Sequence, residues 1–335
     1  MRRIVLLVAG LGAVVLAARD VQSQLWAVLP LAQAQVVDVP RGATLNGLLR
    51  ELEQRGVLGS ARQRQYLSWY ARLSGQARAL KAGEYSLTPG LRAIDLTALL
   101  ASGRVVLHEL RLLEGWTFAQ ALAAVRAHAA IAQTLPPDGT VEHLMEALGA
   151  AGRHPEGRFY PDTYRFPRGT SDVAFLRRAY LTLERVLDEE WAARAPELPY
   201  ASPDQALIMA SIVEKETGRV DERAEIAGVF VRRLKLGMRL QTDPSVIYGL
   251  GAAFDGNLRK RDLLADGPYN TYTRAGLPPT PICLPGRAAL HAALHPAPGK
   301  TLYFVARGDG SHQFSETFAD HEAAVRKYQL KRGRR

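Results

Sequence analysis

The stretch SPDQALIMASIVEKETG, residues 202–218, carries the start and end signals of one complete helix. Ser202 followed three residues later by Gln205 is a capping box, and Pro203 suits the first helical position. Gly218 is a residue type that commonly ends helices. The stretch therefore predicts a largely apolar helix between these two ends, around which a core can form.

Two carboxylates near the end of this helix differ in their expected surroundings. At about 100° per residue, Glu216 lies on an apolar stripe of the helix, whereas Glu214 lies on the opposite side. The stripe is formed by Met209, Ile212 and Val213. Desolvation and the negative end of the helix dipole both raise the pKa of a carboxyl group. Glu216 is therefore a candidate general acid near neutral pH, and the alternative is a partly buried glutamate paired with an arginine.

Length and composition place the chain among ordinary globular proteins of about two domains. Its net charge of +10 is not concentrated in a Lys/Arg run interleaved with aromatic residues, so we expect no nucleic-acid partner. The sequence has neither a glycine-rich phosphate loop nor a G-x-S-x-G motif. Nucleotide use and nucleophile-elbow chemistry are therefore not expected.

Few residues favour metal or thiol chemistry, and we expect no cofactor. Cys283 is the only cysteine, which excludes an intramolecular disulfide and a thiolate zinc cluster. His291 and His295 have the i,i+4 spacing that can hold a metal, but HAALH lacks the glutamate of a zincin. We therefore predict an ordinary helix face and no metal site.

The N-terminal residues are typical of an exported protein. Arg2 and Arg3 precede an uncharged run from Ile4 to Ala18. Cleavage as a signal peptide is one interpretation, with a passable cleavage site at residues 15–17. Retention as a membrane anchor, with the arginines on the cytoplasmic side, is the other interpretation. The run is shorter than the ~20 residues that span a bilayer comfortably.

The rest of the chain predicts an α+β fold, because short strand patterns and helical patterns are mixed along it. Residues 21–35 have no clear period and are predicted to be a linker. Three strand–turn–helix units follow, with turns at Gly42, Gly90 and Gly115. Residues 152–170 are rich in proline, glycine and aromatic residues, which is typical of a loop that lines a ligand groove.

The remaining possibility is carboxylate chemistry in a groove that contains tyrosine and amide side chains. Cleavage of a glycosidic bond fits this chemistry. Glycoside hydrolases normally need a second carboxylate at about 5–9.5 Å from the first. Asp243 in RLQTDP and Asp162 in FYPDTY are the candidates for this role. Capping a short helix at residues 245–249 is the alternative role of Asp243.

Several segments, taken in order, resemble the endolytic murein transglycosylases of the MltG (YceG-like) family. Downstream, the matching segments are MASIVEKET (209–217), FVRRLKLGMRLQTDPSVIYGLG (230–251), YNTYTRAGLPP (269–279) and LYFVARGDGSHQFSET (302–317). Upstream, they are KAGEYSLTPG (81–90), LLEGWT (112–117) and EGRFYPDTY (156–164). PICLPG at 281–286 departs from the family pattern, because Leu284 stands where the family usually has Asn or Thr. The N-terminal apolar run is also shorter than is usual for the family.

This resemblance implies a single-pass protein of the inner membrane with most of the chain in the periplasm. Its implied parts are a cytoplasmic stub and transmembrane anchor at 1–20, a linker at 21–35, a small LysM-like α/β domain at 36–106 and a larger mixed α+β catalytic domain at 107–335. The implied reaction cuts MurNAc-β-1,4-GlcNAc bonds within glycan strands and leaves 1,6-anhydroMurNAc ends, which terminates nascent strands. Peptidoglycan glycan strands are the implied substrate, and peptidoglycan synthases of the elongation or division machinery are the implied partners.

The resemblance also implies that Glu216, the glutamate before Thr217, is catalytic, in agreement with its place on the helix. One carboxyl group suffices for this reaction, first as an acid and then as a base toward the C6 hydroxyl of muramic acid. The candidate substrate-binding residues are Glu214, Gln241, Asp243, Tyr248, Asn270, Tyr272, Tyr160 and Asp162. Glu214 is expected to orient a neighbouring group or to form an ion pair, with Arg239 as the candidate partner.

Two other interpretations stay open. In a non-catalytic peptidoglycan-binding protein, the LysM-like region would do the binding and Glu216→Gln would change nothing. A two-carboxylate muramidase would produce reducing ends and would depend on Asp243 or Asp162.

Overall fold

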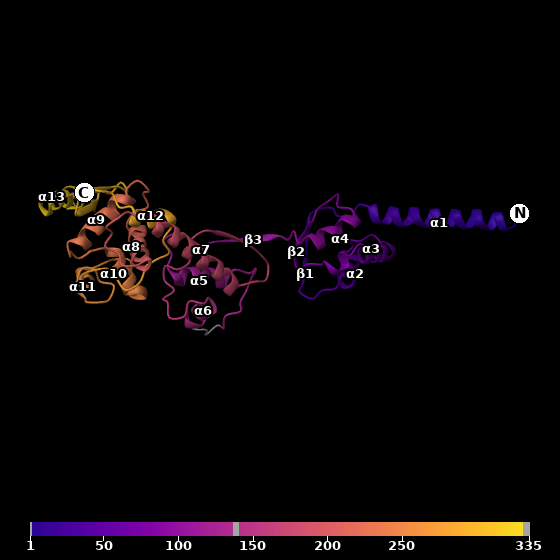
Figure 1. Ribbon diagram of the computed structural model, residues 1–335, viewed down its shortest axis with the longest axis horizontal. Coiled ribbons are helices and arrows are strands. Elements are labelled where there is room, and N and C mark those ends of the chain that lie inside the picture. Colours follow the sequence, from indigo (N-terminus) through magenta and orange to yellow (C-terminus); the bar gives the residue numbers. More distant parts are fainter. Residues whose placement is uncertain (1, 137–140, 331–335) are drawn as a thin grey trace. The chain divides into compact units, whose positions relative to one another are not determined.

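The computed structural model describes residues 2–136 and 141–330, with side chains from residue 8 onward. The chain divides into two compact units, whose α-helices are labelled in Figure 1. The first contains the chain up to His108 together with Arg165–Thr170, and the second contains Glu109–Tyr164 and the chain from Ser171 onward. Helices are combined with short two-stranded sheets, which confirms the predicted α+β class.

The first unit has a two-stranded antiparallel sheet and several helices that share one core. Its elements are α1 (Arg2–Trp26), β1 (Gln35–Val39), α2 (Leu45–Gln54), α3 (Ala61–Leu73), the 3₁₀ turn η1 (Gln76–Arg78), β2 (Gly83–Leu87) and α4 (Ala93–Ser102). Val37 pairs with Tyr85 across the sheet, and both side chains are fully buried. Gly42 adopts a φ of +81° in the turn, and Thr44 caps α2 by accepting a hydrogen bond from the amide of Gly47. The first predicted strand–turn–helix unit is therefore confirmed.

Helix α1 overturns the predicted membrane anchor and the predicted inner-membrane location. In the part of the chain that the structure describes, no helix combines the length and the apolar character that crossing a bilayer requires. The uncharged run of the sequence is shorter than the ~20 residues needed, and α1 continues beyond it through Arg19 and Asp20. At the end of α1, Leu25 packs into the core of the first unit. The hydroxyl of Tyr66 also donates a hydrogen bond to Asp20 at 2.9 Å.

The second unit is larger and mostly helical. Its helices are α5 (Phe118–Ala127), α6 (Val141–Ala147), α7 (Asp172–Ala192), α8 (Pro203–Glu216), α9 (Arg223–Lys235), α10 (Asp243–Leu250), α11 (Lys260–Leu264), α12 (Arg287–Leu294) and α13 (Phe318–Tyr328), with the 3₁₀ turn η2 (Gly251–Ala253). Its strands include β4 (Ile131–Ala132) and the antiparallel hairpin of β7 (Tyr303–Ala306) and β8 (His312–Ser315). The strands β3 (Leu107–Arg111), β5 (Thr163–Pro167) and β6 (Thr170–Ser171) lie where the chain passes from one unit to the other.

Helix α8 is the predicted helix of residues 202–218, and its start is confirmed. The side chain of Ser202 accepts a hydrogen bond from the amide of Gln205 at 3.4 Å. Every residue from Ala206 to Val213 is buried, because α8 contacts α7, α9, α10 and α12. The helix ends at Glu216, since Thr217 adopts an extended backbone conformation. Because the middle of α8 is buried on all sides, only the end of the helix can place a carboxylate in the wall of a cavity.

Candidate active site

The end of α8 lies at a cavity of about 450 Å³ in the second unit. Glu216 is in the wall of this cavity, together with Gln241 and Asp243 at the start of α10 and Tyr272 after α11. The hairpin and α13 contribute other parts of the wall, namely Tyr303, Phe304, Val305, Ala306, His312, Phe318, His321, Val325 and Gln329. The structure thus brings four predicted site residues together from three separate segments.

The Glu216 carboxyl has the protonation behaviour that a general acid needs. Burial is the main cause that raises its pKa to about 7, and the charge of Asp243 raises the pKa further. The hydroxyl of Thr242 donates a hydrogen bond to Oε1 of Glu216, and this bond acts in the opposite direction. Near neutral pH, the carboxyl group is therefore present in both its protonated and its ionised form.

Buried hydroxyl groups hold Thr242 in place behind this carboxyl group. The amide of Thr242 donates to Oγ1 of Thr271 at 3.0 Å, and the hydroxyl of Ser245 donates to the carbonyl of Thr242 at 2.9 Å. The hydroxyls of Ser245 and Thr271 are 2.9 Å apart. All three side chains are at most 2% exposed. Because each polar atom here has a partner, the position of the Thr242 hydroxyl is well defined.

Asp243 and Tyr272 form a second pair in the cavity wall. The hydroxyl of Tyr272 donates to Oδ1 of Asp243 at 2.5 Å. Burial, followed by this hydrogen bond and the charge of Asp243, raises the pKa of Tyr272. Thr242, not Asp243, is the N-cap residue of α10, and the Asp243 carboxylate faces the tyrosine. Asp243 therefore presents a negative charge near Glu216 and fixes the Tyr272 ring.

Gln241 has an unusual backbone conformation at the same place. Its φ of 55° is in the left-handed region, which costs a residue with a side chain about 1–2 kcal/mol. The amide of Gln241 donates to the carbonyl of Thr271 at 3.1 Å. Its Oε1 accepts from the buried guanidinium of Arg233 at 3.3 Å, and Arg233 also donates to the carbonyl of Leu240 at 2.9 Å. The neighbouring structure thus holds a strained residue at the cavity, as is common at functional sites.

Glu214 lies outside the cavity wall, and its partner is Arg223 instead of the predicted Arg239. Nη2 of Arg223 is 3.0 Å from Oε1 of Glu214, and the amide of Gly286 donates to Oε2 at 2.9 Å. The Glu214 and Arg223 side chains are 5% and 8% exposed. Burial raises the pKa of Glu214, while the Gly286 bond and the Arg223 charge act against this rise. The observed role of Glu214 is therefore to connect helices. Its ion pair joins α8 to α9, and its hydrogen bond joins α8 to the start of α12.

The Asn270 side chain supports the segment that carries Tyr272. Its Nδ2 donates to three backbone carbonyls at 2.6 to 3.2 Å, those of Asp262, Leu263 and Ala265. Its Oδ1 accepts from the amide of Tyr272 at 2.9 Å. Asn270 is buried and lies outside the cavity wall, so its contact with substrate stays a prediction.

The other three predicted binding residues also lie outside this cavity wall. Tyr160 packs partly buried against the core of the second unit, and Oδ1 of Asp162 accepts from the amide of Thr163 at 2.7 Å. Tyr248 lines a neighbouring cavity of about 920 Å³. There its hydroxyl donates to the buried Glu156 at 3.0 Å.

Glu156 and Thr242 carry no prediction from the sequence, although both lie in quoted motifs. Oε1 of Glu156 accepts from the amide of Phe118 at 2.9 Å, which joins the loop of residues 152–162 to the start of α5. Burial raises the pKa of Glu156, while its hydrogen bonds lower it. Glu156 is the first residue of EGRFYPDTY, and Thr242 lies between Gln241 and Asp243. Their buried partners, however, come from segments far away in the sequence.

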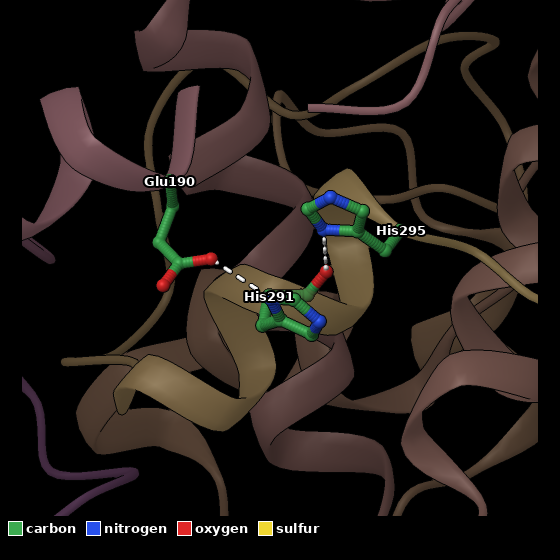
Figure 2. Close-up of side chains that lie close together, drawn as sticks. All are labelled: Glu190, His291 and His295. Atoms are coloured by element: carbon green, nitrogen blue, oxygen red, sulfur yellow. Dashed lines mark hydrogen bonds and ion pairs between the residues drawn. The ribbon is translucent and has the colours of Figure 1, made fainter. Parts of the chain in front are cut away.

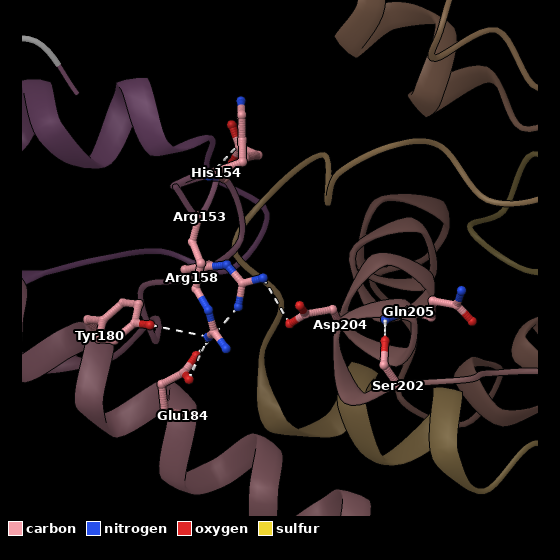
Figure 3. A network of polar contacts seen from close by, with 9 residues as sticks. Arg153, His154, Arg158, Tyr180, Glu184, Ser202, Asp204 and Gln205 are labelled. Atoms are coloured by element: carbon pink, nitrogen blue, oxygen red, sulfur yellow. Dashed lines mark hydrogen bonds and ion pairs between the residues drawn. The ribbon is translucent and has the colours of Figure 1, made fainter. Parts of the chain in front are cut away.

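Residues 152–162 form a loop as predicted, but the predicted loop is wrong for residues 163–167, which form β5. Two arginines fasten the loop of residues 152–162 to α7 and α8, as Figure 3 shows. Arg158 is 8% exposed, and its Nη2 is 2.8 Å from Oδ1 of Asp204 in the first turn of α8. Its Nη1 is 3.5 Å from Oε1 of Glu184 on α7. Arg153 is paired with Oε2 of Glu184 at 2.9 Å. These ion pairs fix the beginning of the helix whose end carries Glu216.

The chain is similar to known proteins over most of its length. A model of the YceG-like family matches residues 37–327. The chain is 30% identical over 308 residues to an endolytic murein transglycosylase of Bacillus subtilis (strain 168), and the match covers 87% of this chain and 84% of that protein. It is 27% identical over 330 residues to a protein of the same name from Streptococcus pneumoniae serotype 2, where the match covers 86% of this chain and 57% of the relative.

A solved structure is similar as well. The crystal structure of a yceG-like protein from Listeria monocytogenes superimposes with a TM-score of 0.56 at 29% sequence identity. The match covers 88% of this chain and 99% of that one.

Proposed function

Because this chain belongs to the YceG-like family, we propose that it is an endolytic murein transglycosylase that cleaves MurNAc-β-1,4-GlcNAc bonds within glycan strands. The observation that carries the proposal is the Glu216 carboxyl in a cavity wall, with its pKa raised to about 7. Such a group can give a proton and take one back at the same pH.

In the first step, protonated Glu216 donates its proton to the glycosidic oxygen. The bond between this oxygen and C1 of the muramic acid then breaks, and the protonated oxygen leaves as the hydroxyl of GlcNAc. Thr242 occupies Oε1 of Glu216 as a hydrogen-bond donor, so Oε2 is the atom that carries the acidic proton. Asp243 places a negative charge near the positive charge that develops on the sugar ring.

In the second step, ionised Glu216 takes the proton of the C6 hydroxyl of the same muramic acid. The C6 oxygen attacks C1, and the product is a 1,6-anhydro ring. No water is consumed, and Glu216 returns to its protonated form. A half-buried position of the carboxyl in a recessed cavity supports this reaction, because water would compete with the C6 hydroxyl.

We also propose that Gln241, Asp243 and Tyr272 hold the sugar next to Glu216. Their place in the same cavity wall supports this assignment, and the amide and phenol groups match the polar groups of an amino sugar. Tyr248 and Glu156 in the neighbouring cavity are then candidates for contacts farther along the strand.

A two-carboxylate muramidase is the second candidate function, since the charge of Asp243 acts on Glu216. In that reaction Asp243 would be the second carboxylate, and water would take the place of the C6 hydroxyl. The products separate the two functions, because hydrolysis gives reducing ends instead of anhydro ends.

The test is mass spectrometry of the products formed from purified glycan strands by the wild-type protein and by Glu216→Gln. We expect 1,6-anhydroMurNAc ends with the wild type and none with the variant. Reducing ends would assign the protein to the hydrolases, and Asp243→Asn would then be the next variant. If neither protein cleaves but both bind the strands, a non-catalytic binding protein would replace the proposed enzyme.

For the organisation of the chain, we propose a LysM-like domain at residues 36–106 and a catalytic domain from residue 107 onward. The boundary between the two compact units, which lies near His108, supports this division. Peptidoglycan synthases of the elongation or division machinery stay a predicted class of partner. Pull-down of these synthases with the full chain tests the prediction.

A further inference from the structure

Away from the active site, the structure brings together three side chains that are metal ligands by type. Glu190 lies near the end of α7, His291 lies in the last turn of α12, and His295 directly follows α12. One ligand atom from each residue can be chosen so that all of them lie within 4.8 Å of one another. Figure 2 shows Glu190 facing His291, with the two imidazole rings close together.

We propose that Glu190, His291 and His295 form a binding site for a divalent transition-metal ion such as Zn²⁺. Two imidazoles and one carboxylate are a donor set that suits such ions, and a water molecule completes a tetrahedral site. Neither the reaction proposed above nor the HAALH spacing by itself accounts for a buried glutamate at this place. The third ligand comes from a helix that is 101 residues away in the sequence.

The distances are compatible with a metal ion after a small movement of the side chains. Two ligand atoms on one tetrahedral Zn²⁺ lie about 3.3 Å apart, given metal–ligand bonds of about 2.0–2.2 Å. Nδ1 of His291 is 2.9 Å from Oε2 of Glu190. The His291 side chain is 60% exposed, and His295 is partly exposed, so rotation can bring the ligand atoms to a common distance.

Each histidine keeps a nitrogen lone pair for a metal ion. A neutral imidazole has one N–H and one lone pair. Nδ1 of His291 faces Oε2 of Glu190, so a metal ion bound by both atoms replaces the hydrogen bond between them. The N–H of His291 is then on Nε2, and the lone pair of Nδ1 binds the ion. His295 has its Nε2 at 2.8 Å from the carbonyl of Ala193 and its Nδ1 at 3.2 Å from the carbonyl of His291. In a neutral imidazole only one of these nitrogens donates, and rotation of the partly exposed ring turns the lone pair of the other away from its carbonyl and toward the ion.

The charges around the site also favour a cation. The C-terminal end of α12, where His291 and His295 lie, carries the negative end of the helix dipole. Glu190 is 7% exposed, and its Oε1 accepts from Nε of Arg287 at 2.7 Å. Arg287 is the positive group that competes with a metal ion for this carboxylate. Its removal is therefore expected to increase the affinity for the metal.

A metal ion bound here connects the end of α7 to the end of α12, and both helices pack against α8. The effect to measure is therefore binding and thermal stability of the full chain. We expect calorimetric titration with ZnCl₂ to give one strong site, and a hundredfold excess of Zn²⁺ over Kd to raise Tm by about 5 °C or more. A chelator should reverse this rise.

The matched variants change the affinity in opposite directions. His291→Ala with His295→Ala, both at exposed or partly exposed positions, should lower the affinity at least a hundredfold, and Glu190→Gln should lower it at least tenfold. Arg287→Gln should raise the affinity, because it removes the cation that competes for Glu190. Zn²⁺ binding that is equal in the wild type and the double histidine variant would overturn the proposal. The absence of binding and of a Tm shift in the wild type would overturn it as well.

Discussion

Glu214 and Glu216 lie two residues apart at the end of α8, and both have a raised pKa because of burial. The two carboxyl groups differ in the partners that surround them. Glu214 has a cation, Arg223, and a backbone amide, whereas Glu216 has one neutral hydroxyl and a nearby negative charge. An ion pair compensates a buried carboxylate, but a hydroxyl compensates it only in part. Glu216 is therefore the carboxyl group that can exchange a proton near pH 7.

The raised pKa of Glu216 predicts how Glu216→Gln changes the stability. A carboxyl group has a pKa of about 4.5 when unfolded, and folding raises the pKa of Glu216 to about 7. Folding therefore favours the protonated form, so the wild type loses stability as the pH rises from 4.5 to 7. We expect Glu216→Gln to be about 1–3 kcal/mol more stable than the wild type above pH 7 and equally stable below pH 4.5. Urea denaturation at several pH values measures this difference, and a constant difference at all pH values would contradict the assignment.

Thr242 predicts a change in the pH dependence of activity. Thr242→Val keeps the shape of the side chain but removes the hydrogen bond that lowers the pKa of Glu216. The protonated acid then persists to higher pH, so the alkaline limb of kcat/KM should move up by about one pH unit. We expect kcat to fall about tenfold, because Oε1 is no longer held. Thr242→Ser is the control and should restore both properties, whereas equal pH profiles for Val and Ser would exclude this role of the hydroxyl.

At the scale of the elements, the junction of α8 and α9 depends on one buried ion pair. Arg223 and Glu214 are both nearly inaccessible to solvent, and Glu214 also accepts from the amide at the start of α12. Removing one partner of such a pair leaves the other as an uncompensated buried charge.

Arg223→Met is therefore expected to cost about 3–5 kcal/mol of unfolding free energy. The double variant Glu214→Gln with Arg223→Met should lose much less, because glutamine is neutral and still accepts from Gly286. Urea denaturation of the two single variants and the double variant measures the coupling between the residues. Additive losses would show that the pair does not determine the stability of this junction.

At the scale of the whole molecule, the two units have separate hydrophobic cores. The first core includes Leu49 and Tyr85, and the second includes Leu207 and Phe230. Separate cores commonly unfold separately, since few interactions connect their stabilities.

Calorimetry of the full chain is therefore expected to show two unfolding transitions. A buried Leu→Ala change costs about 2–5 kcal/mol of unfolding free energy. Leu49→Ala should therefore lower the transition temperature of the first unit only, and Leu207→Ala that of the second unit only. A single transition that both variants shift equally would show that the units unfold as one.

The sequence by itself determined the local structure and the main catalytic candidate. Capping signals at Ser202 and the apolar run after it predicted α8, and the ordered motifs predicted the family. Local hydrogen bonding and side-chain periodicity decide where such a helix forms, so short stretches of sequence contain this information. The prediction of a membrane anchor was wrong. It gave more weight to the N-terminal charge pattern than to the shortness of the apolar run.

Only the tertiary structure decided which groups act together. Thr242, Asp243 and Tyr272 meet Glu216 through packing of α8, α10 and the segment after α11. Glu190 reaches His291 from another helix in the same way. Because burial and long-range partners set the pKa of a carboxyl group and complete a ligand set, neither property can be obtained from the spacing of residues along the chain.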